Sequence, residues 1–122
     1  MPSGNKVMQV DKYYLSHNLY GDIPYMNRIY CFSGEIPFGA INFYKKGLAP
    51  KSKVSFLITG DFQEFELNCE NDRYQEIIET FRYEKPLYMV VIWDRNNMLT
   101  GATVTTFAEP VGEQEGSGAP PA

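Results

Sequence analysis

The residues best suited to recognition chemistry gather in one tyrosine-rich segment near the start of the 122-residue chain. Tyrosine mixed with asparagine, glycine and serine is typical of binding surfaces, because rigid amphipathic rings provide contact area at low entropic cost. The arginine of this segment suits a carboxylate, a phosphate or an aromatic ring. We predict a surface for a protein partner or a small-molecule ligand, made of Tyr13, Tyr14, His17, Tyr20, Tyr25, Arg28 and Tyr30. In the alternative interpretation, these rings only pack beneath a long loop.

His17 is the only histidine, and it could act as a general base if Asp11 or Asp22 oriented its ring. However, no serine or cysteine lies in a nucleophile motif, and the glycine-rich motifs that bind phosphate are missing. One histidine and two distant cysteines also lack the spacing of metal ligands. We expect a non-catalytic protein without a metal or a cofactor, and we keep a small enzyme that uses His17 as an alternative.

A basic loop at residues 45–53 follows two aromatic residues and offers a second candidate surface. Proteins that bind single-stranded nucleic acid use rings that stack on bases and lysines that follow phosphates. The residues of this alternative are Phe43, Tyr44, Lys45, Lys46, Lys51 and Lys53. The formal net charge of −4 and the lack of arginine in the loop oppose it. We prefer a solvated loop that protects a sheet edge, and we expect no nucleic-acid partner.

The composition is that of one globular domain, since 43% of the residues are hydrophobic. Cys31 and Cys69 have no CxxC motif, and we expect both to be reduced, buried thiols. The first residues lack the apolar core of a secretion signal, and no apolar run is long enough to span a membrane. We therefore expect a cytoplasmic protein without a membrane partner.

The clearest structural pattern predicts a helix over residues 72–83. Asp72 has the side chain of an N-cap, and Gln75 stands where it would complete a capping box. Pro86 has no backbone N–H and would end the helix before it. Apolar residues at the spacing of one helical face predict packing on the core, namely Tyr74, Ile77, Ile78 and Phe81.

Residues 87–93 are apolar at every position, which predicts a central strand covered on both faces. Residues 94–97 have turn chemistry, and residues 99–107 are predicted to form a threonine-rich partner strand. Gly101 within that strand predicts a bulge or a close backbone approach.

The remaining segments predict five short strands upstream of the helix, at residues 6–15, 28–32, 40–44, 54–59 and 62–68. Residues 16–27 would form a long loop between the first two. This order predicts an α+β fold: a curved, mainly antiparallel sheet of about seven strands with one packed helix. An OB-like, partly open barrel has a similar element order. We expect a single domain at residues 1–108 and a disordered acidic tail at residues 109–122.

These observations together predict a non-catalytic binding module that uses its tyrosine-rich surface. Self-association, with a dimer as the first expectation, is predicted because a small aromatic-rich sheet leaves a face to be covered. By analogy with other small acidic proteins, an accessory or inhibitor protein from a phage or mobile element fits this description.

Overall fold

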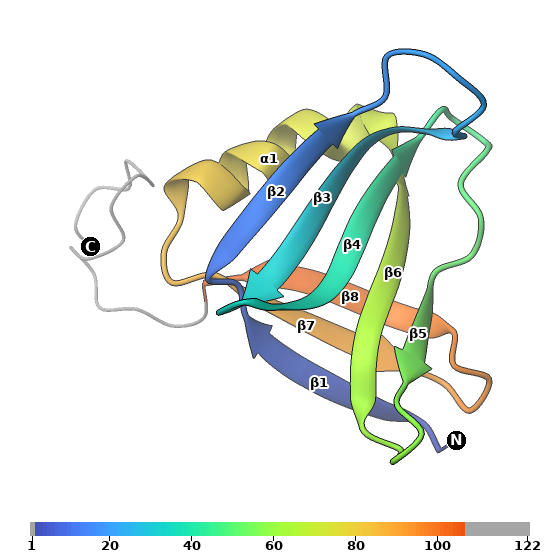
Figure 1. Ribbon diagram of the computed structural model, residues 1–122, viewed down its shortest axis with the longest axis vertical. Helices are drawn as coiled ribbons and strands as arrows, with labels where there is room; N and C mark the ends of the chain where they lie inside the picture. The colour runs from blue at the N-terminus through green and yellow to red at the C-terminus, as the bar shows by residue number, and fades with distance from the viewer. Residues whose placement is uncertain (1, 107–122) are drawn as a thin grey trace, which may run out of the picture.

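The computed structural model describes residues 2–106, which form two β-sheets and one α-helix (Figure 1). The larger sheet has the order β2-β3-β4-β6-β5, with β2 (Lys12–His17), β3 (Tyr25–Ser33), β4 (Ile36–Tyr44), β6 (Phe62–Glu70) and β5 (Lys53–Phe56). The smaller sheet has the order β1-β7-β8, with β1 (Gly4–Gln9), β7 (Tyr88–Trp93) and β8 (Leu99–Thr105). A 3₁₀ turn (Asn71–Arg73) leads into helix α1 (Tyr74–Tyr83).

The predicted α+β class with mainly antiparallel sheets is therefore confirmed, with eight strands in place of about seven. The strands of the described residues form two sheets and close no barrel, in contrast to the OB-like form. The predicted tail at residues 109–122 lies outside the described residues.

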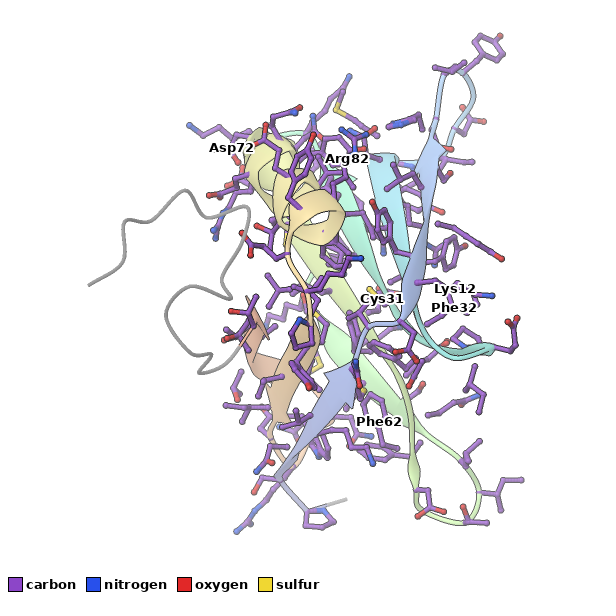
Figure 2. All side chains as sticks on the ribbon, turned by 90° about the vertical axis from the view of Figure 1, so that its left-hand side faces the viewer. Lys12, Cys31, Phe32, Phe62, Asp72 and Arg82 are labelled. Carbon is purple, nitrogen blue, oxygen red and sulfur yellow. The ribbon has the colours of Figure 1, made fainter. Side chains whose placement is uncertain are left out.

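Helix α1 and the three-stranded sheet lie on the same face of the five-stranded sheet (Figures 1 and 2). Their apolar side chains meet those of β3, β4 and β6 in a single buried cluster. No described element covers the opposite face of the five-stranded sheet, and we call this the open face. Figure 2 shows Lys12 and Phe32 on that open side, and Cys31 between the layers.

Helix α1 packs as its apolar spacing predicts. Ile78 and Phe81 are buried, and Tyr74 and Ile77 are partly buried against the core. The predicted capping is wrong, because no side chain caps the 3₁₀ turn or α1. An N-cap needs extended backbone. Asp72 instead lies inside the 3₁₀ turn, where the chain already coils as it leaves β6.

Strand β7 lies at the centre of its sheet, as predicted. Its inner face is buried, but Ile92 on the outer face is 47% exposed, so the expected cover on both faces is wrong at this position. The β7–β8 register shifts between Ile92 and Trp93, directly beside Gly101, which confirms the predicted bulge.

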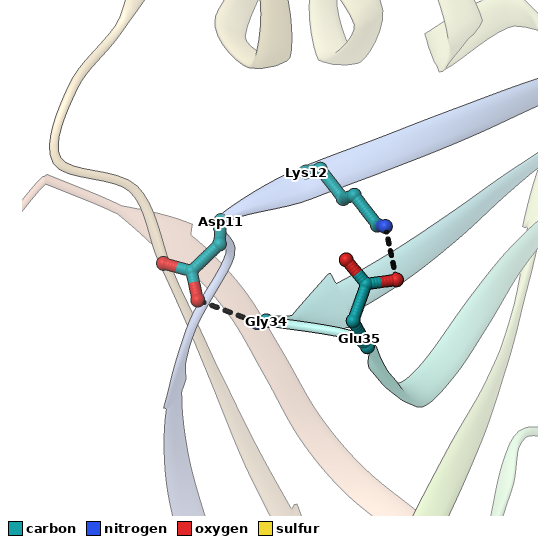
Figure 3. Close-up of polar contacts among 4 residues, drawn as sticks. All are labelled: Asp11, Lys12, Gly34 and Glu35. Atoms are coloured by element: carbon teal, nitrogen blue, oxygen red, sulfur yellow. Dashed lines mark hydrogen bonds and ion pairs between the residues drawn. The ribbon is translucent and has the colours of Figure 1, made fainter.

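The predicted strand at residues 6–15 is two strands that belong to different sheets. The chain changes sheets at Val10 and Asp11, where the Asp11 N–H donates to the Phe32 carbonyl over 2.8 Å. The Asp11 carboxylate accepts from the Gly34 N–H at 2.6 Å, and Lys12 pairs with Glu35 at 2.8 Å (Figure 3). These contacts fasten the sheet crossing to the β3–β4 turn.

The β2–β3 loop is shorter than predicted, because β2 continues to His17 and β3 begins at Tyr25. Strands β3 and β4 likewise extend beyond the predicted residues 28–32 and 40–44, whereas β5 ends at Phe56. Strand β6 inserts beside β4 and pairs with it in parallel, while all other named pairs are antiparallel.

Candidate functional site

The predicted tyrosine-rich surface is divided between the two faces of the five-stranded sheet. Successive side chains of a strand point to opposite faces. Tyr13 accordingly points inward, with its ring 5.3 Å from that of Phe81, while Tyr14 points to the open face. His17 also lies on the inner side, 5.9 Å from the ring of Tyr74. The seven residues therefore do not form one surface.

Tyr20 belongs to neither face. It stands at the tip of the β2–β3 loop and is 98% exposed. The base of this loop is fixed, because Asn18 donates to the carbonyl of Met26 from its backbone and to that of Tyr25 from its side chain.

Arg28 is the centre of the group that remains on the open face. Its guanidinium carbon lies 4.2 Å from the centre of the Tyr30 ring and 5.3 Å from that of Tyr25. One guanidinium nitrogen, Nη1, donates to the Tyr25 hydroxyl at 3.0 Å. Arg28 forms no ion pair with any carboxylate of the described residues. The charged guanidinium group of Arg28 is thus held between two aromatic rings, and no described residue provides a counter-ion for it.

Asn42 lies opposite Arg28 in the β3–β4 register and is only 2% exposed. Its amide nitrogen donates to Asn68 at 3.0 Å, but its oxygen accepts no hydrogen bond from any described residue. The Nε of Arg28 is also buried and has no acceptor among residues 2–106. Each such group costs about 1–3 kcal/mol when it is left unsatisfied. A donor and an acceptor are therefore buried without partners at neighbouring positions.

Strand β6 adds a carboxylate to this group, because Asn68 donates to Glu66 at 3.2 Å. Burial raises the pKa of the neighbouring Tyr44 hydroxyl, and the charge of Glu66 raises it further, whereas Arg28 opposes the shift. Sequence reasoning missed Asn42, Asn68 and Glu66. The alternation of residues 40–44 does place Asn42 on the other face of the strand from the apolar Ile41 and Phe43. This alternation is the sequence signal that could have identified Asn42 as a residue of the open face.

A second cation–ring contact lies beside the first on the open face. The Nζ of Lys12 lies 5.6 Å from the ring centre of Tyr14 and 5.3 Å from that of Phe32. The two rings are 4.9 Å apart. The hydrogen bond to Glu35 raises the pKa of Lys12, so its ammonium group stays charged at neutral pH. Strands β2 and β3 therefore present two cations among four aromatic rings, those of Tyr14, Tyr25, Tyr30 and Phe32.

His17 is exposed, and its Nδ1 lies 2.6 Å from the side-chain oxygen of Asn27. Asp11 lies at the other end of β2, where it binds Gly34, and Asp22 is exposed in the loop. The predicted orientation of His17 by Asp11 is therefore wrong. An amide that accepts from His17 cannot supply the negative charge that such an orienting carboxylate would provide.

Phe43, the first aromatic residue of the nucleic-acid alternative, cannot contact a base. It is fully buried in the core, and its ring lies 5.0 Å from that of Tyr74. Tyr44 is also buried, and its ring centre lies 6.0 Å from that of Tyr25 on the open face. Neither ring is free to stack on a base. The lysines of this alternative are exposed: Lys45, Lys46, Lys51 and Lys53.

The two cysteines are free thiols, as predicted, although Cys69 is only partly buried. They lie on β3 and β6, which β4 separates. The Cα atoms of the two cysteines are therefore at least two strand spacings apart, or about 9–10 Å. A disulfide needs Cα atoms within about 7 Å, so the two thiols cannot pair. Burial raises the pKa of Cys31 to about 12, which makes it an inert thiol at neutral pH.

Comparisons of the chain with models of protein families, with curated proteins and with solved structures found no match. Within residues 2–106, no three His, Cys, Asp or Glu side chains are grouped as a metal site would require. The helix of the described residues is too short and too polar to cross a membrane.

Proposed function

We propose that the protein is a non-catalytic binding module that recognises a protein partner through the open face. The observation that carries this proposal is Arg28, a partly exposed cation that no carboxylate of residues 2–106 pairs with. It is held between Tyr25 and Tyr30 on a sheet face that no described element covers. Arginine and tyrosine are enriched at the centres of protein interfaces, where a few such residues provide most of the binding energy.

The contacts of Arg28 also favour tight binding. Two rings and one hydrogen bond already fix its side chain, so little rotamer entropy remains to be lost when a partner binds. A planar guanidinium binds a carboxylate through two parallel hydrogen bonds. We therefore expect the partner, or a small ligand in its place, to present a carboxylate to Arg28. An accessory or inhibitory role, suggested above by analogy, would act through this same face.

Site-specific photo-crosslinking in the cells that make the protein tests the proposal. Tyr14→p-benzoylphenylalanine places the crosslinker on the open face, where the tyrosine is 54% exposed. Tyr83→p-benzoylphenylalanine is the matched control, since this tyrosine is 64% exposed but lies on α1. We expect protein adducts at position 14 and none at position 83. Adding Arg28→Ala should weaken binding by about 2 kcal/mol, or roughly 30-fold, and remove the adduct.

Two outcomes would contradict the proposal. The first is no adduct at position 14, and the second is the same set of adducts at positions 14 and 83. Mass spectrometry of the adducts would show whether the captured protein is the chain itself or another protein.

A further inference from the structure

We infer that the partner of the open face is a second copy of this chain, bound face to face about a two-fold axis. The inference rests on the proposed function, and it names the partner of the same surface. It is carried by the distribution of charge over the open face, which is complementary to itself.

Apart from Lys53 on β5, cations and anions occupy opposite sides of this face. Strands β2 and β3 carry Lys12 and Arg28, whereas β6 carries Glu64, Glu66 and Glu70. Strand β4 lies between the two sides and presents only uncharged side chains there, those of Ala40, Asn42 and Tyr44.

Among the described residues, the glutamates of the acidic side form no ion pairs, as is also true of Arg28. Glu66 accepts from the Asn68 amide, and Glu70 accepts from the Gly47 N–H at 3.0 Å. None of the three glutamates pairs with a cation of the described residues within 4.0 Å. Within residues 2–106, each copy thus carries on one face an arginine without an anionic partner and glutamates without cationic partners.

A two-fold axis parallel to β4 brings the two sets together. Two sheets that pack face to face lie about 10 Å apart. Such an axis places β3 of one copy over β6 of the other and keeps the strand positions level. Arg28 is level with Asn68 across β4, so it would lie between Glu66 and Glu70 of the partner subunit. The same contacts form a second time by symmetry, as in any isologous interface.

The remaining side chains of the face fit the same arrangement. Lys53, on the edge strand β5, is opposite Glu66 in its own copy, and Glu66 is level with Tyr14 across the sheet. Lys53 would therefore meet the ring of Tyr14 of the partner subunit, which is a favourable contact for an ammonium group. No pair of like charges is brought together at these positions.

Charge-reversal variants of the full chain test the inference by sedimentation velocity over a series of concentrations. We expect the wild type to dimerise, and Arg28→Glu and Glu66→Arg each to weaken the dimer at least tenfold. An equimolar mixture of the two variants should restore a dimer, because the introduced carboxylate of one faces the introduced guanidinium of the other. Arg82→Glu, on the exposed side of α1, is the control and should leave dimerisation unchanged.

A wild-type chain that stays monomeric at about 1 mM, the limit of weak association, would overturn the inference. A mixture that fails to dimerise would do the same. Circular dichroism of each variant shows whether it folds. If Arg28→Glu does not fold, Glu66→Gln replaces it, and a dimer as tight as that of the wild type would contradict the inference.

The experiments distinguish failure of the proposed binding function from failure of the inferred self-association. A monomeric chain that still forms an adduct at position 14 with a different protein would leave the proposed function standing and remove only the self-association. A monomeric chain without any adduct at position 14 would remove both.

Discussion

Among the described glycines, Gly39 has the least space for a side chain. It lies opposite Phe65 in the parallel β4–β6 pair, and a Cβ atom built at Gly39 would overlap the Phe65 ring. Phe65 is buried in the core and cannot turn away. A residue without a side chain is therefore required where the two strands bring backbone and ring together.

We expect Gly39→Ala to lower the free energy of unfolding by about 1–3 kcal/mol, because the ring or the strand must shift to admit the methyl group. Gly101→Ala is the matched control, since its Cβ would lie 3.5 Å from Ile92, an ordinary contact. Its effect should stay below about 1 kcal/mol. Urea unfolding measures both changes. Equal losses for the two variants would contradict this account of Gly39.

The residues of the candidate site were predictable only in part. Tyr14, Tyr25, Arg28 and Tyr30 are grouped in the sequence because β2 and β3 form one hairpin. Glu66 and Asn68 could not be assigned to the site from sequence, because they reach it through a parallel pairing across more than twenty residues. Local spacing carries no information about such a neighbour.

Among the secondary-structure elements, α1 was predicted well because its signal is local and periodic. The split of residues 6–15 into β1 and β2 was not predictable in the same way. Both halves have the residue types of a strand, and only the packing of one sheet on the other requires the change of sheet at Asp11. The β7 strand shows the same limit, since an apolar outer face does not prove that something covers it.

The helix leads to a prediction at this scale. Ile78 lies on α1 and is buried in the core cluster, so Ile78→Ala should lower the free energy of unfolding by about 2–5 kcal/mol. Glu79→Ala changes the next residue, which is exposed, and should change the free energy of unfolding by less than about 0.5 kcal/mol. Thermal and urea unfolding would measure the two variants. Similar values for both would show that α1 does not pack as described.

For the whole molecule, titration of buried and partly buried acids predicts how stability depends on pH. Burial raises the pKa of Cys31 to about 12, and it also raises the pKa values of Cys69, Tyr44 and Tyr74. The folded state then binds more protons than the unfolded state above about pH 9. The contribution of these groups to stability is therefore fully present below about pH 9 and is lost progressively as the pH rises toward their folded-state pKa values.

The largest contribution should come from Cys31, with a slope of up to about 1.4 kcal/mol per pH unit between about pH 9 and pH 11. Urea unfolding at several pH values tests this in the wild type and in Cys31→Ala. The variant has a smaller core side chain and starts from a lower stability, but its stability should fall less steeply with pH. Parallel curves for the two proteins would show that Cys31 does not titrate as described.

The pairing of β1 with β7 also bears on the order in which the chain acquires structure during synthesis. All five strands of the larger sheet lie between Lys12 and Glu70, whereas Gly4 pairs with Trp93, close to the other end of the described chain. On the ribosome, β1 must wait unpaired until β7 has emerged, after all five strands of the larger sheet. The larger sheet can assemble first, and the smaller one is completed only after β7 and β8 have been synthesised.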